Sequence, residues 1–192
     1  MMKIVVMRHG KPRLDLEVIK SSKMASSSLG EIVERYELTE LDKSFPPDDD
    51  AVNISKVCVS SLSSDLPRAV SSIEILGLSE VNCDDSLFRE SALPYLELDS
   101  PRLSFFTWAI IFRIAWFFGF SKNGESIRKA KNRASQGVDK LENVVRKECT
   151  LLFMGHGIIN RLIIIELKRR KWKVREKTAE KYWSYTVLEY ET

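Results

Sequence analysis

Cysteine is scarce in this chain, and the cysteines that are present form no recognisable pattern. The three of them, Cys58, Cys83 and Cys149, lie far apart and fit neither a CxxC motif nor a Cys/His ligand spacing. This excludes a fold framed by disulfides and gives no indication of a zinc site. Free thiols of this kind favour a reducing, cytoplasmic location.

The chain also lacks a long hydrophobic run and a strong charge of one sign. Its most apolar stretch, residues 105–120, is shorter than the roughly 20 residues that cross a bilayer and carries Arg113 near its centre. It has no lysine-rich polar face, so a membrane partner is not expected. The 30 Lys and Arg residues against 27 Asp and Glu give a charge of +3, which is too mild for a general nucleic-acid binder. An anionic small substrate is compatible with that charge.

Length and patterning predict a single α/β domain. The chain has 192 residues, of which 44% are hydrophobic, and shows no internal repeat. No signal peptide is expected, because a strand begins within the first ten residues. Apolar, β-branched runs predict strands at residues 2–7, 56–60, 80–83, 151–154 and 183–190. Helical spacing predicts helices at residues 29–41, 67–76, 105–120, 121–147 and 158–168. This order favours a three-layer sandwich around a mostly parallel central sheet.

Only two histidines occur, and both follow a predicted strand. His9 lies in an RHG tripeptide at residues 8–10, and His156 lies in a GHG tripeptide at residues 155–157. Because ligands bind at the carboxyl ends of parallel strands, the two imidazoles are expected to lie face to face there. A neutral imidazole can act as a nucleophile and a charged one can hold an anion. The alternative is a pair of structural loop histidines.

Two further residues are candidates for the same edge of the sheet. Arg68 falls in the first turn of a helix that starts at Pro67, and free N–H groups there attract phosphate. A solvated helix arginine is the alternative. Glu90 follows an apolar pair in a loop, so it could be desolvated enough to act as a general acid. Its alternative is a salt-bridged surface carboxylate.

The strand followed by RHG, the SSDLPRA segment at residues 63–69 and the strand followed by GHG occur in that order along the chain. Together they resemble the histidine phosphatase superfamily, which has the phosphoglycerate mutase-like fold. The segment KP at residues 11–12 and YWSY at residues 182–185 are more similar to small bacterial phosphatase-like members than to the glycolytic mutases.

The resemblance implies roles for five residues. His9 would attack phosphorus and form a phosphohistidine, while Arg8, Arg68 and His156 would surround the phosphoryl oxygens. Glu90 would protonate the leaving alcohol and then activate water. Arginines and a protonated histidine can offset the transition-state charge, so no metal and no organic cofactor are expected.

Other positions are secondary candidates. The resemblance gives Glu125 a supporting role and places a cap over the site at about residues 94–120. Many members have asparagine where this chain has Asp15, and a carboxylate there would repel phosphate unless it pairs with a base such as Arg13. Side chains that could bind a substrate anion are Lys11, Arg13, Arg102 and Arg113. An ion-paired or snorkelling arginine is the alternative for the last two.

The leading hypothesis is a metal-independent phosphomonoester hydrolase of the histidine acid phosphatase type. It would act on a phosphorylated small molecule through a phosphohistidine at His9. The alternatives are a phosphoglycerate-type mutase, a phosphatase for protein phosphohistidine, and a non-catalytic phosphate-binding or membrane-associated partner. The helix at residues 105–120 is expected to be packed nearly all round, as a lid or as a homodimer contact.

Overall fold

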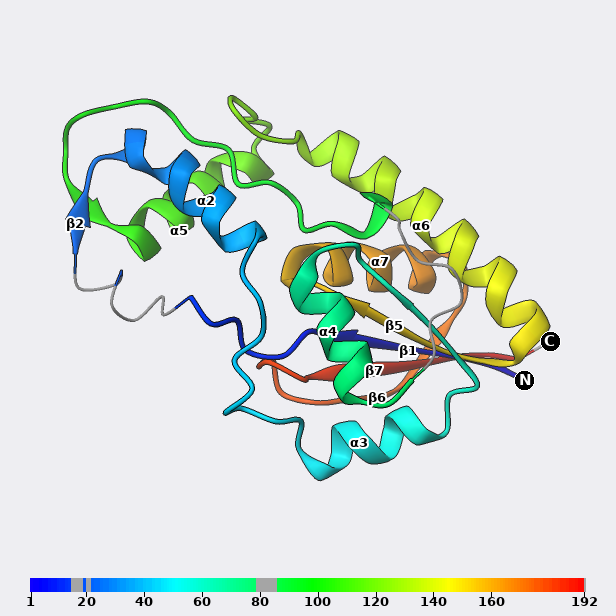
Figure 1. The fold of residues 1–192 in the computed structure, drawn as a ribbon. Coiled ribbons are helices and arrows are strands. Elements are labelled where there is room, and N and C mark those ends of the chain that lie inside the picture. The colour runs from blue at the N-terminus through cyan, green and yellow to red at the C-terminus, as the bar shows by residue number, and fades with distance from the viewer. Residues whose placement is uncertain (15–18, 20–21, 79–85, 192) are drawn as a thin grey trace.

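The centre of the molecule is a five-stranded mixed sheet with the strand order β3-β5-β1-β7-β6 (Figure 1). The computed structural model describes residues 1–14, 19, 22–78 and 86–191. Strands β1 (Met2–Arg8), β5 (Thr150–Gly155) and β3 (Ser60–Ser63) are parallel to one another. Strands β7 (Tyr185–Tyr190) and β6 (Lys173–Lys177) extend the sheet in antiparallel fashion. The predicted mostly parallel core is confirmed, with an antiparallel edge added.

Helices cover both faces of this sheet, because alternate residues of the apolar strands point to opposite sides. In β1, Ile4 and Val6 belong to one apolar cluster, and Val5 and Met7 belong to another. The first cluster includes residues of α6 (Ile127–Glu148) and α7 (Gly157–Arg169), and the second includes residues of α3 (Asp49–Lys56) and α4 (Pro67–Ile75). The three-layer α/β sandwich predicted from the sequence is therefore confirmed.

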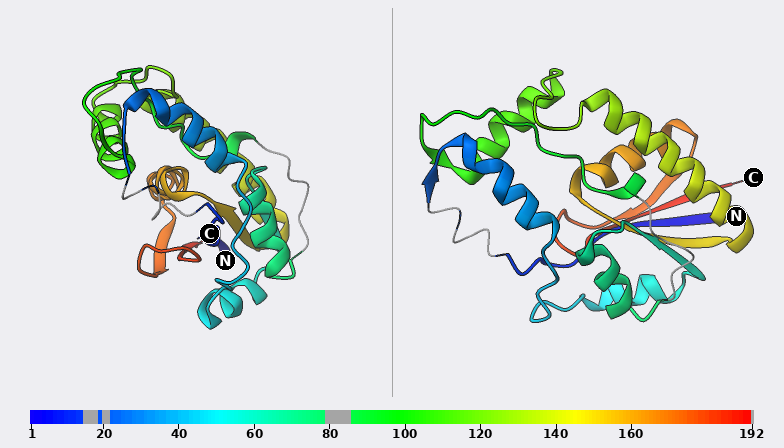
Figure 2. Two further views of the ribbon diagram at one scale, coloured as in Figure 1. Left: turned by 60° about the vertical axis from the view of Figure 1, so that its left-hand side comes forward. Right: turned by 45° about the horizontal axis from the view of Figure 1, so that its top comes forward.

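A smaller group of elements lies beyond the carboxyl ends of β1 and β5 and is called the outer unit (Figures 1 and 2). It consists of α2 (Leu29–Glu37), α5 (Phe105–Phe117) and a two-stranded sheet of β2 (Lys23–Met24) and β4 (Leu103–Ser104). Its own apolar cluster is built on Leu29, Trp108 and Phe112. Two short 3-10 helices, at Ser26–Ser28 and Ser86–Phe88, complete the described elements.

The strand predicted at residues 56–60 is misplaced. Lys56 ends helix α3, which the sequence analysis did not predict, and the strand is Ser60–Ser63. Val57 and Val59 are 52% and 71% exposed, whereas all four residues of the serine-rich strand are buried. The strand is set by its pairing with β5 and by the burial of its small side chains, so the apolar run was the wrong signal.

The prediction that the helix at residues 105–120 is packed nearly all round is wrong. Helix α5 buries one stripe, formed by Trp108, Phe112 and Trp116. These positions are four residues apart and therefore lie on one face. Ile114 and Phe118 on other faces are 54% and 88% exposed. A homodimer contact at this helix stays a prediction.

The remaining differences are local. Strand β6 was not predicted, helix α6 begins at Ile127 after Ser126, and β7 begins at Tyr185. The strand predicted at residues 80–83 lies outside the described residues. Within the described part of the chain, no helix combines the length and apolarity that a membrane crossing requires.

Candidate active site

The two histidines meet at the carboxyl ends of two neighbouring parallel strands. In the β1/β5 pairing Arg8 is opposite Gly155, so the next residue of each strand end falls at the same level. The ring centroids of His9 and His156 are 4.9 Å apart, and both side chains are buried. The strand-end pattern in the sequence thus placed both imidazoles correctly.

The hydrogen bonds of His9 define which ring nitrogen carries the proton. Its Nδ1 lies 2.6 Å from the carbonyl oxygen of Gly10, and a carbonyl can only accept, so the proton belongs on Nδ1. Nε2 therefore carries the lone pair, and Nε of Arg68 donates to it at 3.3 Å. Burial, and next the charge of Arg68, lower the pKa of His9 well below its ordinary value. The ring is neutral at neutral pH, with its lone pair on Nε2.

Gly10 fixes the loop that carries His9. The indole of Trp183 occupies the space beside it, and a Cβ at this position would lie 2.4 Å from the ring. The backbone N–H of Gly10 donates to Oγ of Ser72 in α4 at 3.0 Å. The close approach of the indole requires glycine here, and Ser72 ties the loop to the helix that also carries Arg68.

Arg68 lies in the first turn of α4, which starts with Pro67 after an extended Leu66. Its side chain is buried, so it is not the solvated helix arginine considered as the alternative. Nη1 donates to the carbonyl oxygens of Tyr36 and Glu37, at 2.9 and 3.0 Å. Burial lowers the pKa of Arg68, yet a guanidinium remains charged at neutral pH. The side chain joins His9 to the end of helix α2.

Arg8 and His156 contribute buried nitrogen atoms with unused hydrogen-bonding capacity. Nε of Arg8 and both ring nitrogens of His156 have no hydrogen-bond partner among the described residues. The Arg8 guanidinium lies over the ring of Tyr182, 4.5 Å from its centroid. Buried polar groups are normally paired, so this cluster of donors and cations fits an anion with several oxygens.

His156 differs from the expectation in its charge. Burial lowers the pKa of His156 well below its ordinary value, and the neighbouring His9, Arg68 and Arg8 lower it further. The ring is therefore neutral as it stands, and it can become the expected cation only when a bound dianion raises its pKa.

Glu90 lies at the N-terminus of α7. Its carboxylate accepts hydrogen bonds from the backbone N–H groups of Ser91, Ile158 and Ile159, at 2.9 to 3.1 Å. Negative charge is favoured at this end of a helix. The described residues provide no salt bridge to Glu90, so the surface ion pair considered as the alternative is not what the structure has. Glu90 reaches the site from the loop between α4 and α5.

Glu125 stabilises the loop that carries Glu90 by pairing with Arg133. Its carboxylate pairs with Arg133 at 2.9 and 2.7 Å. Nη1 of Arg133 donates to the carbonyl oxygens of Leu87 and Arg89, both at 2.7 Å. These bonds fix the segment that leads to Glu90, so Glu125 acts through Arg133.

Lys11 and Arg13 are engaged elsewhere. Nζ of Lys11 lies over the ring of Phe45, 3.7 Å from its centroid. Arg13 pairs with Glu40 at 3.4 Å on the surface, with both side chains 69% exposed. The substrate-binding role of both residues stays a prediction. Asp15 lies outside the described residues, and Arg102 is exposed.

Comparison with known proteins decides the family. Residues 48–192 match the model of the histidine phosphatase superfamily (branch 1). The chain belongs to this superfamily. Membership supports a phosphatase activity. The matched region begins after His9, whose place in the site rests on its ring contact with His156 and on the hydrogen bond from Arg68. No curated protein sequence matches this chain.

Solved structures of similar fold include two proteins that are named as phosphatases. The product of open reading frame Rv3214 from Mycobacterium tuberculosis has a TM-score of 0.65 and 14% identity, over 99% of this chain and 92% of that one. A phosphoserine phosphatase from Entamoeba histolytica has a TM-score of 0.56 and 16% identity, over 97% and 90%. A putative α-ribazole-5′-P phosphatase from Escherichia coli has a TM-score of 0.56 and 15% identity, over 87% and 80%. At these identities the likeness shows the fold alone.

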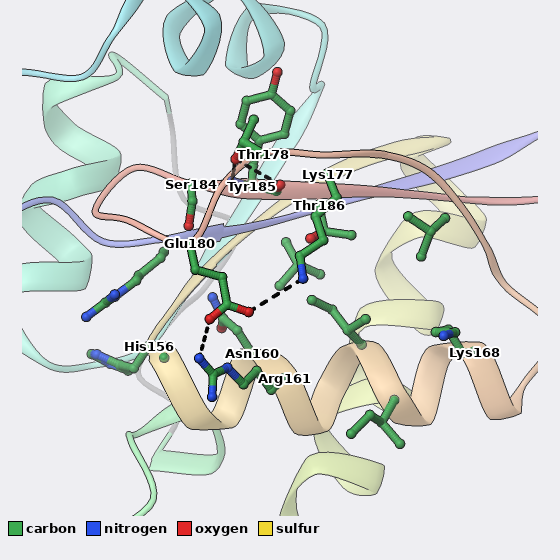
Figure 3. A pocket seen from close by; sticks show the side chains of 16 residues that line it. His156, Asn160, Arg161, Lys168, Lys177, Thr178, Glu180, Ser184, Tyr185 and Thr186 are labelled. Atoms are coloured by element: carbon green, nitrogen blue, oxygen red, sulfur yellow. Dashed lines mark hydrogen bonds and ion pairs between the residues drawn. The ribbon is translucent and has the colours of Figure 1, made fainter. Parts of the chain in front are cut away.

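Two cavities adjoin the candidate active site. The α2–α5 cavity, of about 350 Å³, has Arg68 and Glu90 at its base and Arg113 in its wall. The α7 cavity, of about 480 Å³, lies between α7 and strands β6 and β7 and has Arg8 and His156 at one end. Figure 3 shows Glu180 across the α7 cavity, where it pairs with Arg161 and Lys177.

Four residues at this site were not expected from the sequence: Tyr36, Ser72, Asn160 and Tyr182. Nδ2 of Asn160 donates to the carbonyl of Met7 at 2.9 Å, which joins α7 to the strand before His9. Ser72 and Asn160 each lie four residues after a recognised site residue on the same helix, and this spacing was an available signal. Tyr36 comes from α2, and no feature of the sequence linked it to Arg68.

Proposed function

We propose that this chain is a metal-independent phosphomonoester hydrolase that works through a phosphohistidine at His9. The observation that carries the proposal is the neutral Nε2 of His9, buried beside His156 and 3.3 Å from Nε of Arg68. An unprotonated imidazole nitrogen beside cationic groups suits attack on a phosphate dianion, which takes over the hydrogen bond of Arg68 when it binds. Family membership supports the same chemistry.

The reaction would proceed in two steps. Nε2 attacks phosphorus, the N–P bond forms as the P–O bond breaks, and the leaving oxygen takes a proton from Glu90. The Glu90 carboxylate then accepts a proton from water, the resulting hydroxide attacks phosphorus, and the N–P bond breaks to release phosphate. For the first step Glu90 must carry its proton on the oxygen that faces the leaving group.

Charge compensation in this proposal comes from the protein. Arg8 and Arg68 supply two cations, and His156 adds a third once the phosphoryl dianion raises its pKa. Fixed cations directed at the equatorial oxygens are what phosphoryl transfer requires. No metal or organic cofactor takes part. The free thiols of Cys58 and Cys149 agree with the cytoplasmic location that belongs to this proposal.

The test is phosphate release from a panel of phosphomonoesters with chelator present. Wild type should turn over, and His9→Ala should lose about 10⁴-fold or more in kcat. After a rapid quench, wild type should carry a phosphoryl group that is stable in alkali and labile in acid, as expected for an N–P bond. Turnover by a folded His9→Ala protein would contradict the proposal. Transfer of the phosphoryl group to a second alcohol instead of water would favour the mutase alternative.

A further inference from the structure

The α2–α5 cavity is the space into which a leaving group would extend. Glu90 lines this cavity and Arg68 lies beside it, whereas among the described residues Glu90 does not line the α7 cavity. The proposed acid must touch the leaving oxygen, so the group attached to that oxygen must project between α2 and α5. The character of this cavity therefore selects the alcohol portion of the substrate.

The walls of the cavity are mostly apolar. Helix α5 contributes aromatic rings and a small side chain, α2 contributes an aliphatic and a phenolic side chain, and the loop that carries Glu90 contributes a leucine. The residues are Val33, Tyr36, Leu93, Phe105, Phe106 and Ala109. A volume of about 350 Å³ is at the small end of the range for ligand pockets. An apolar ring fits these walls, whereas a short polar alcohol would leave its own groups without partners.

Arg113 places one cation in this apolar wall. Its Nη2 donates to the carbonyl of Ser91 at 3.2 Å, and its guanidinium lies over Trp116, 4.9 Å from the ring centroid. Nη1 is buried and has no hydrogen-bond partner in the part of the chain that the structure describes. The charge of Glu90 also acts on this guanidinium, and the unpaired Nη1 donor fits an anionic oxygen of a ligand.

We propose that the preferred substrate is the phosphate ester of an aromatic alcohol that carries a carboxylate. The ring occupies the α2–α5 cavity, and the carboxylate accepts from Nη1 of Arg113. This inference rests on the proposed function, because it assigns the leaving group of that same reaction. This substrate differs from the phosphate ester of an amino acid or a polyol because it has both an apolar ring and an anion at the far end of that ring.

The experiment compares ethyl, benzyl and carboxybenzyl phosphate, whose leaving alcohols have similar acidity. In wild type, kcat/KM should rise by about tenfold or more from ethyl to benzyl, and again by about tenfold to one carboxybenzyl isomer. The Ala109→Phe variant fills the cavity and should lose the benzyl preference while ethyl phosphate is still hydrolysed. The matched control is Ile114→Phe, on an exposed position of the same helix, which should change neither ratio.

Arg113→Gln tests the anion separately. In this variant, kcat/KM for carboxybenzyl phosphate should fall to that for benzyl phosphate. The ratio of kcat/KM for benzyl phosphate to that for ethyl phosphate should stay as in wild type. An equal loss with all three esters would indicate a structural role and overturn the carboxylate assignment. Hydrolysis of all three esters at one rate by wild type would overturn the inference but leave the proposed function standing. No hydrolysis of any ester by folded wild type would count against the proposed function itself.

Discussion

At the residue scale, the dominant feature is a pair of neutral imidazoles buried among cations. His9 and His156 are in ring contact, and burial together with Arg68 and Arg8 opposes a proton on either ring. This arrangement keeps the nucleophile reactive at mildly acidic pH. It also makes folding compete with protonation, because an unfolded chain can protonate both histidines freely near pH 6.5.

The first prediction concerns the pH dependence of the free energy of unfolding. Because the folded-state pKa values of His9 and His156 are lowered, the unfolded state binds more protons below about pH 6.5. The stabilisation from neutral burial is complete above that pH and is lost as the pH falls toward the folded-state values. The loss is at most about 1.4 kcal/mol per pH unit for each histidine.

Urea unfolding between pH 8 and pH 5 checks this, with wild type compared to His156→Gln. The variant should lose less stability on acidification, since one titrating group is gone. Carboxylates contribute equally to both proteins, so they cancel in the comparison. Parallel curves for the two proteins would contradict the prediction.

At the scale of elements, the loop after β1 depends on α4. Oγ of Ser72 accepts from the N–H of Gly10 at 3.0 Å and donates to the carbonyl of Arg68 at 2.7 Å. One hydroxyl thus bridges the loop that carries the nucleophile and the helix turn that carries its cationic neighbour.

The second prediction follows from this bridge. Ser72→Ala should cost about 1 kcal/mol in the free energy of unfolding and lower kcat/KM about tenfold or more, since the N–H of Gly10 loses its partner. The matched control is Ser55→Ala in α3, a buried serine whose Oγ donates to the carbonyl of Val52 at 2.8 Å. It should cost a similar amount of stability and leave kcat/KM unchanged. Equal activity in the two variants would show that the bridge does not position His9.

The elements that the sequence predicted are those whose own composition determines their burial. Residues 2–7 and 151–154 are apolar and β-branched or aliphatic, and both form central strands. Strand β6 has the sequence KVREK and is exposed along its whole length, so only its pairing with β7 makes it a strand. Pairing partners are a tertiary property that local patterns do not contain.

The residues of the site also divide into those that a local pattern places and those that depend on tertiary packing. His9, Arg68 and His156 follow strands of one sheet, so a rule about strand ends was enough to bring them together. Tyr36 reaches Arg68 from the outer unit, and Tyr182 reaches Arg8 from the turn between the last two strands. Neither contact follows from periodicity, because both depend on how separate layers pack.

At the scale of the whole molecule, the described residues form apolar clusters of unequal size. Two large clusters flank the sheet, whereas Leu29, Trp108 and Phe112 are the only buried members of the outer unit's cluster among the described residues. Small clusters give small free energies of local opening.

The third prediction is a difference in amide hydrogen exchange. Peptides from α2 and α5 should exchange about tenfold or more faster than peptides from α6 and α7, since the latter pack on the sheet. Mass spectrometry of the native protein at neutral pH measures this. Helices α6 and α7 serve as the internal control, because they are helices of comparable or greater length in the same molecule. Uniform protection of all four helices would contradict the prediction.

The two bonds from Arg68 to the carbonyls of Tyr36 and Glu37 have a thermodynamic consequence. One guanidinium both faces the histidines and holds the last turn of α2, so the position of the outer unit and the affinity for a phosphoryl group are linked quantities. By reciprocity, whatever factor phosphate contributes to closing α2 onto the sheet, closure of α2 contributes the same factor to phosphate affinity. A variant that loosens the end of α2 would then bind phosphate more weakly.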